Sequence, residues 1–113
     1  MIELRVSEAA ALSIIEQADY YRAAQDDTLA ERWESAVDAS VRSLLQFPER
    51  GAPCRLDTPS LANLRWIFVP GFLRHMVFYR YDRQESMLLV VQVLHGARDL
   101  ESVLSDDPQE EQL

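Results

Sequence analysis

The side chains best suited to chemistry are arginine, histidine and tyrosine residues gathered between positions 65 and 98 of the sequence. His75 and His95 are the general acid–base candidates that titrate near neutrality. Brought together on one surface, such side chains would stabilise a phosphoryl transition state and move a proton. The candidate site set consists of Arg65, Arg74, His75, Tyr79, Arg80, His95 and Arg98.

The alternation of side chains along a strand opposes a single shared site. The pattern over Phe72–Tyr81 predicts a strand, on which His75 and Tyr79 share one face. Arg74 and Arg80 share the opposite face. In the alternative interpretation, the face with histidine and tyrosine packs under helices while the arginines project into solvent. The sequence leaves both interpretations open.

Other site chemistries are not indicated. Neither histidine has a metal-ligand spacing, and the single cysteine, Cys54, provides neither a disulfide nor a zinc ligand set. The chain has no G-x-S-x-G turn, and its three glycines are too scattered to cradle a phosphate. It also has no lysine, which excludes Schiff-base chemistry and a Walker-type loop. We therefore expect no metal and no cofactor.

The charge of the chain is negative overall but unevenly distributed. The formal net charge is -8, and all 11 basic residues are arginine. Residues 50–98 hold seven arginines and three acids, whereas residues 1–49 hold ten acids and four arginines, and residues 99–113 hold six acids and no arginine. Such a chain is not built to bind DNA directly, because that binding depends on many basic contacts to phosphate. The basic middle predicts one cationic face suited to planar, bidentate recognition.

The length of 113 residues predicts one domain, which we place at residues 1–104, followed by an acidic tail at residues 105–113. The first residues lack the pattern of a signal peptide. The longest apolar stretch, around Met87–Val91, is too short to span a bilayer. We therefore expect a cytoplasmic protein without membrane association.

Hydrophobic periodicity predicts two helices after a first strand at Ile2–Val6. Ser7 is the expected N-cap of a helix that runs to about Ala24. The second helix is expected to start in a capping box formed by Thr28 and Glu31 and to end near Phe47, before Pro48. The short linker, Gln25–Asp27, predicts an antiparallel helical hairpin.

Three further strands are expected after a loop at Glu49–Leu61. They span Leu64–Val69, Phe72–Tyr81 and Met87–Leu94, with turns at Pro70-Gly71 and Asp82–Ser86 and a short helix at Asp99–Leu104. The predicted class is α+β, in the order β-α-α-β-β-β, with a helical hairpin packed on a mainly antiparallel sheet.

Short motifs occur in a specific succession along this framework. They are L-R-W at 64–66, P-G-F at 70–72, V-F-Y-R-Y at 77–81 and V-L-H-G-A-R-D-L at 93–100, with F-P-E-R-G at 47–51 and a tyrosine pair at 20–21. In this succession the chain resembles the RelE/ParE toxin superfamily of type II toxin–antitoxin systems, over about residues 2–104. The resemblance implies the same order of elements as the periodicity does.

The resemblance implies one of two activities. ParE-like members poison DNA gyrase by protein–protein contact, whereas RelE-like members cut mRNA on the ribosome. In a nuclease, Arg65 and Arg80 would balance phosphate charge, and His95 or Tyr79 would transfer a proton. The missing lysines, the acidic net charge and the lack of a basic-aromatic run after the last strand depart from the RelE pattern, while H-G-A-R-D resembles the ParE branch.

We therefore expect a gyrase inhibitor rather than an enzyme, with a ribosome-dependent mRNA endoribonuclease as the alternative. A third possibility is an inactive module that only binds an antitoxin. The resemblance implies a cognate antitoxin in every case. The hypothesis is that acidic antitoxin side chains pair with Arg65, Arg74 or Arg80, while apolar ones fill the groove beside the helical hairpin. The target and antitoxin surface is expected at Arg65, Arg74, His75, Arg80, His95 and Arg98.

Overall fold

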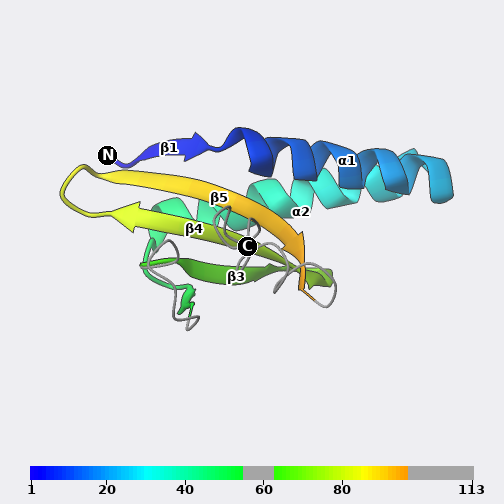
Figure 1. The fold of residues 1–113 in the computed structure, drawn as a ribbon. Helices are drawn as coiled ribbons and strands as arrows, with labels where there is room; N and C mark the ends of the chain where they lie inside the picture. The colour runs from blue at the N-terminus through cyan, green and yellow to red at the C-terminus, as the bar shows by residue number, and fades with distance from the viewer. Residues whose placement is uncertain (55–62, 97–113) are drawn as a thin grey trace, which may run out of the picture.

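The fold is a helical hairpin lying on one face of a five-stranded sheet, as predicted (Figure 1). The computed structural model describes residues 1–54 and 63–96. Its elements are β1 (Glu3–Val6), α1 (Glu8–Ala24), α2 (Asp27–Gln46), β2 (Ala52–Pro53), β3 (Arg65–Val69), β4 (Phe72–Asp82) and β5 (Met87–His95).

The sheet has the order β1-β5-β4-β3-β2, and three of its four strand pairings are antiparallel. β1 pairs in parallel with the first half of β5, placing Glu3 beside Met87 and Val6 beside Val90. Because β1 is short, the second half of β5 has no partner strand on that side and continues toward the end of the sheet that lies under the helical hairpin. There the hairpin extends past the end of the sheet (Figure 1).

The first helix begins as predicted, whereas the predicted cap of the second helix is wrong. The Ser7 side chain accepts a hydrogen bond from the Ala10 N–H at 2.9 Å. The N-cap of α2 is Asp26, whose carboxylate accepts from the Leu29 N–H at 2.9 Å, and Thr28 lies inside the first turn. An aspartate caps as well as a threonine, and its charge also favours the positive end of the helix dipole. The helix therefore starts two residues earlier than expected.

The main core lies between the helices and the sheet. Trp33 of α2 is fully buried at its centre, and its indole N–H donates to the Ile14 carbonyl oxygen of α1 at 3.0 Å. The sheet contributes alternate residues from each strand, as its period of two requires. The buried members from the strands are Ile67, Val69, Val77, Tyr79, Leu88, Val90 and Val93.

The opposite face of the sheet differs from the prediction of a solvated arginine face. It carries a second buried cluster made of Leu64, Met76, Phe78 and Leu94. Arg74 and Arg80 share this face of β4, with Arg74 exposed and Arg80 half-buried at either end of the cluster. Met76 and Phe78 are the reason for the difference, because their apolar side chains occupy the strand positions between the two arginines.

Several boundaries follow the sequence closely, and one element was missed. The Pro70-Gly71 turn is present, with Gly71 at a φ of 84° that favours glycine. β2 lies inside the predicted loop and pairs with β3, and such a short edge strand containing Pro53 has no detectable alternation. The remainder of that loop at 55–61, Arg98, the predicted helix at 99–104 and the tail at 105–113 lie outside the described residues.

One irregularity shifts the pairing of β4 with β5. Phe78 pairs with Gln92 while Tyr79 pairs with Val90, so Val91 is an extra residue on β5. The Val91 carbonyl oxygen accepts from the Ser7 hydroxyl at 2.7 Å, and the Gln92 side-chain oxygen accepts from Ser13 at 2.8 Å. The bulge thus joins β5 to the start of α1.

Neither helix of the described chain has the length and apolar character needed to cross a membrane.

Candidate functional site

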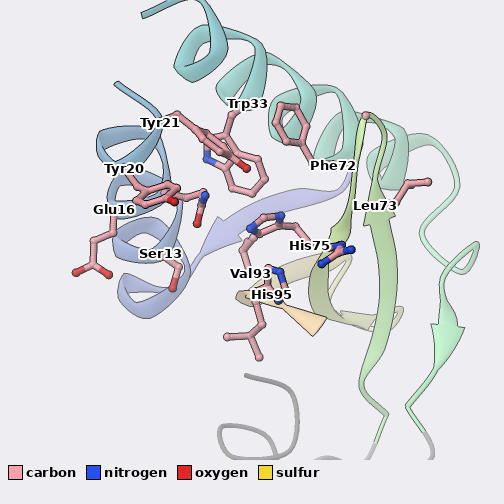
Figure 2. Close-up of a pocket in the computed structure, with 14 residues that line it drawn as sticks. Ser13, Glu16, Tyr20, Tyr21, Trp33, Phe72, Leu73, His75, Val93 and His95 are labelled. Atoms are coloured by element: carbon pink, nitrogen blue, oxygen red, sulfur yellow. The ribbon is translucent and has the colours of Figure 1, made fainter. Parts of the chain in front are cut away.

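A cleft of about 910 Å³ opens beneath the part of the hairpin that extends past the sheet (Figure 2). Its walls come from the middle of α1, from one residue of α2, from the start of β4 and from the end of β5. The lining residues are Ser13, Glu16, Gln17, Tyr20, Tyr21, Trp33, Gly71, Phe72, Leu73, Arg74, His75, Val93, Leu94 and His95.

The floor of the cleft is aromatic. The rings of Tyr21 and Phe72 lie 5.7 Å apart between centroids, and the rings of Trp33 and Phe72 lie 5.3 Å apart in an edge-on arrangement. Tyr21 also meets Trp33 edge-on at 6.1 Å. Such edge-to-face and tilted contacts stabilise an aromatic cluster beyond the area it buries. The floor is therefore an apolar surface made of closely packed rings.

The two histidines face each other on neighbouring strands at the side of this floor. His75 pairs with His95 in the β4–β5 register, and their rings lie 5.2 Å apart in an edge-on arrangement. His75 also meets the Trp33 ring at 4.7 Å and is only 8% exposed. Within the described part of the chain, the buried Nδ1 atom of His95 has no hydrogen-bond partner. The pair is packed as part of the cleft wall.

The rim of the cleft combines exposed apolar side chains with two opposite charges. Tyr20 is 63% exposed and Leu73 is 66% exposed, on opposite walls. Glu16 and Arg74 are both exposed, and they are the single carboxylate and the single guanidinium among the lining residues of the described chain. An apolar groove with a polar rim is typical of a surface that receives a segment of another protein.

Tyr79 and Arg65 lie away from this cleft and hold the segment that follows α2. The Tyr79 hydroxyl donates to the Pro48 carbonyl oxygen and accepts from the Gly51 N–H, both at 2.9 Å. The Arg65 Nη1 donates to the carbonyl oxygens of Gly51 at 2.7 Å and Glu49 at 3.2 Å. Both side chains therefore have structural partners.

The environment of the Tyr79 hydroxyl raises its pKa above the ordinary value of 10.0. Burial is the largest cause, because it disfavours the phenolate. The hydrogen bond from Gly51 and the positive charge of Arg65 act in the opposite direction and only reduce the rise in the pKa. The neutral phenol is thus the form that this position stabilises.

The structure brings only part of the predicted site set together. Arg74, His75 and His95 line the cleft, Arg65 and Tyr79 lie at the exit of α2, and Arg80 lies on the opposite face of β4 from Tyr79. Among the described residues, no three His, Cys, Asp or Glu side chains are grouped around a common point as metal ligands.

The sequence reasoning missed the largest contribution to the cleft, which comes from the aromatic floor and the α1 rim. Trp33 belongs both to the main core and to this floor. The tyrosine pair at 20–21 and the exposed Leu73 after a turn were the available signals. Neither signal indicates a cleft by itself, because the cleft forms only where the helical hairpin lies over the start of β4 and the end of β5.

Similarity to solved structures supports the fold. The chain is similar to the chromosomal ParDE toxin–antitoxin system from P. aeruginosa, at a TM-score of 0.68 and 16% identity, covering 84% of this chain and 96% of the other. It is similar to the isolated E. coli RelE toxin at a TM-score of 0.55 and 14% identity, covering 100% of both chains. The intact E. coli RelBE toxin–antitoxin complex matches at a TM-score of 0.52 and 13% identity, covering 82% of this chain and 94% of the other.

Comparison by sequence gives the family. No curated protein matches the chain. The family model for the ParE toxin of the type II toxin–antitoxin system parDE matches residues 4–100. This range includes both helices, the five strands except Glu3 of β1, and every residue of the cleft. The chain therefore belongs to the ParE toxin family of type II toxin–antitoxin systems.

Proposed function

We propose that this toxin inhibits DNA gyrase by protein–protein contact, and that an antitoxin segment neutralises it by binding in the cleft. The observation that carries the first part is that the two arginines expected to balance phosphate charge, Arg65 and Arg80, lie on different faces of the sheet and outside the cleft that holds His95. His95 lies opposite His75, whereas Tyr79 lies four residues further along β4, a separation of roughly 13 Å at the rise of an extended strand.

The local contacts of these side chains also support a target bound by contact rather than a cleavage reaction. The Tyr79 hydroxyl is buried between two backbone groups, and Arg65 donates to two carbonyl oxygens. Arg80 lies on the other face of the sheet. Proton transfer requires the acid or base within hydrogen-bond reach of the reacting atom, and the phosphate charge must be met at the same place. Arg65 lies beside Tyr79 in the β3–β4 register, but Arg80 lies on the other face and neither arginine lines the cleft with His95, so neither proton-transfer candidate has both arginines at its side.

The test compares two activities of the same purified chain. We expect the protein to inhibit DNA gyrase in a supercoiling reaction and to leave mRNA intact on translating ribosomes. The variant His95→Ala is expected to retain gyrase inhibition. Codon-positioned mRNA cleavage that His95→Ala abolishes would replace this proposal with a ribosome-dependent endoribonuclease. Inhibition of neither system would indicate a module that only binds its antitoxin.

The antitoxin part of the proposal is supported by the exposed apolar rim. Tyr20 and Leu73 project at the opening of a formed aromatic groove, where an apolar segment would cover them. The similar ParDE structure is that of a toxin–antitoxin system, and the similar RelBE structure is that of a toxin–antitoxin complex. Of the three arginines expected to meet acidic antitoxin residues, Arg74 is the one that lines the cleft within the described chain.

A matched pair of substitutions on α1 tests the cleft as the antitoxin site. Tyr20 and Ile15 are exposed to 63% and 55%, but only Tyr20 lines the cleft. The partner in this test is the cognate antitoxin, whose binding to the full chain is measured by calorimetry. Tyr20→Ser should weaken its binding about tenfold, as expected for the loss of an aromatic anchor. Ile15→Ser should leave the affinity unchanged, and equal effects of the two would contradict the cleft.

A further inference from the structure

We propose that the cleft selects a partner segment with a basic side chain and an acidic side chain on either side of an apolar stretch. This inference rests on the proposed function, in which the cleft receives an antitoxin segment. It specifies the chemistry of that segment and the two side chains of the toxin that recognise its charges, Glu16 and Arg74.

The two charges lie on different walls of the cleft. Glu16 extends from α1, beside Ser13 and Tyr20, as Figure 2 shows. Arg74 lines the cleft from the start of β4, on the strand face opposite to that of His75. A segment lying in the cleft therefore meets a negative charge on α1 and a positive charge at the start of β4.

Neither charge is satisfied within the described protein. Several other exposed acids of α1 and α2 form ion pairs, such as Asp19 and Glu34 with Arg22 and Asp38 with Arg42. Within residues 1–54 and 63–96, Glu16 and Arg74 make no ion pair and no side-chain hydrogen bond. Each remains available to a charge of opposite sign.

The floor between the charges determines what must separate them. The rings of Tyr21 and Phe72 form a continuous apolar surface over Trp33, so a polar group placed there would lose its hydration without gaining a partner. The part of the segment over this floor must be apolar or aromatic. Charge complementarity at the rim then fixes the register of the segment and disfavours segments charged in the wrong places.

The experiment selects ligands from a phage-displayed library of random linear peptides on the full chain. The same selection is repeated on Glu16→Arg, on Arg74→Glu and on the double variant Tyr20→Ser/Leu73→Ser, which removes apolar contact without changing charge. Glu31→Arg and Arg32→Glu are the matched controls, because both residues are exposed on α2 and lie outside the cleft. Thermal unfolding confirms that each variant is folded.

We expect the wild-type chain to enrich peptides that combine one basic and one acidic residue around an apolar stretch. Glu16→Arg should enrich peptides without the basic residue, and Arg74→Glu peptides without the acidic one. A peptide selected on the wild type should lose about tenfold in affinity to either variant, and this loss should shrink in high salt because exposed charges are screened. The control variants should bind as the wild type does.

Two results would overturn the inference in distinguishable ways. If all the charge variants enrich peptides of the same charge composition, while Tyr20→Ser/Leu73→Ser still abolishes binding, the charge recognition is wrong and the proposed cleft function stands. If the selection yields no peptide whose binding depends on Tyr20 and Leu73, both the inference and the cleft function fail.

Discussion

The hydroxyl of Tyr79 accepts a hydrogen bond from the Gly51 N–H at 2.9 Å, and a Cβ atom added at Gly51 would lie 2.6 Å from that same oxygen. It would also lie 2.9 Å from the Trp66 carbonyl oxygen, which belongs to the backbone and cannot turn aside. The close approach of the segment after α2 to the sheet therefore requires glycine at this position.

Gly51→Ala is expected to destabilise the fold by about 2 kcal/mol, in the range of overpacked buried positions. Urea unfolding gives the change in the free energy of unfolding. The penalty should persist in the Tyr79→Phe background, because the Trp66 carbonyl oxygen and the Tyr79 ring carbon at 2.7 Å remain in place. A neutral Gly51→Ala would mean that the segment moves away from the sheet without cost.

Tyr79→Phe tests the raised pKa of this phenol. In the folded state the pKa lies above the unfolded value near 10, so the folded state binds the proton more tightly. This contribution to stability is complete below pH 10 and is lost as the pH rises through the folded pKa. The free energy of unfolding should thus decrease more steeply with pH above 10 in the wild type than in Tyr79→Phe. Parallel curves would contradict the shift.

Tyr79→Phe should also lower stability at neutral pH by about 1–2 kcal/mol, because the Gly51 N–H and the Pro48 carbonyl oxygen lose a buried partner. Tyr81→Phe is the comparison, since Tyr81 is on the same face of β4 but is only half-buried. The midpoint of urea unfolding at pH 7 checks the difference. Equal midpoints for the two variants would indicate that the hydrogen bonds contribute nothing net.

The N-cap of α2 is Asp26 in the structure, whereas the sequence pattern predicts Thr28, and two substitutions distinguish these assignments. Asp26→Ala removes the acceptor of the Leu29 N–H and should cost about 1 kcal/mol. Thr28→Ala lies inside the first turn, where alanine is a good helix former, and should change stability by less than about 0.5 kcal/mol. Thermal unfolding of the two variants decides between them. A larger loss in Thr28→Ala would restore the capping box.

Two arginines should behave oppositely when replaced by alanine. Arg65→Ala removes two hydrogen bonds to the segment after α2 and should cost about 1–2 kcal/mol. Arg74 is exposed, and Arg74→Ala should leave stability within about 0.5 kcal/mol of the wild type while weakening partner binding. Unfolding and calorimetric titration, performed on both variants, check this separation of roles.

The order of elements was predictable because the relevant signals are local. The alternation over β4, the apolar run of β5 and the serine before α1 each depend on neighbouring residues only. The cap of α2 was not predictable, because Asp26, Asp27 and Thr28 are all competent caps and the packing of the hairpin decides among them. β2 was missed because a strand of two residues, one of them proline, is too short to show an alternation of apolar and polar side chains.

The site was harder to predict than the fold because its walls are distant in sequence. The alternation of side chains along β4 placed Arg80 on the face opposite His75 and Tyr79. It did not show that His75 and Tyr79, although on one face, contact different parts of the molecule. Tyr79 was notable within the F-Y-R motif, yet its partners, Pro48 and Gly51, belong to a segment about thirty residues earlier. The aromatic floor exists only where α1, α2 and β4 meet.

The parallel pairing of β1 with β5 has a consequence for how the toxin is made. Glu3 leaves the ribosome long before its neighbour, Met87, so β1 can pair with the sheet only after β5 has been made. Until then the helical hairpin carries Tyr21 and Trp33 without the strands that cover them. The cleft is completed by His95 at the end of β5, so a partner that recognises the assembled cleft meets a toxin whose helices and strands have already been made.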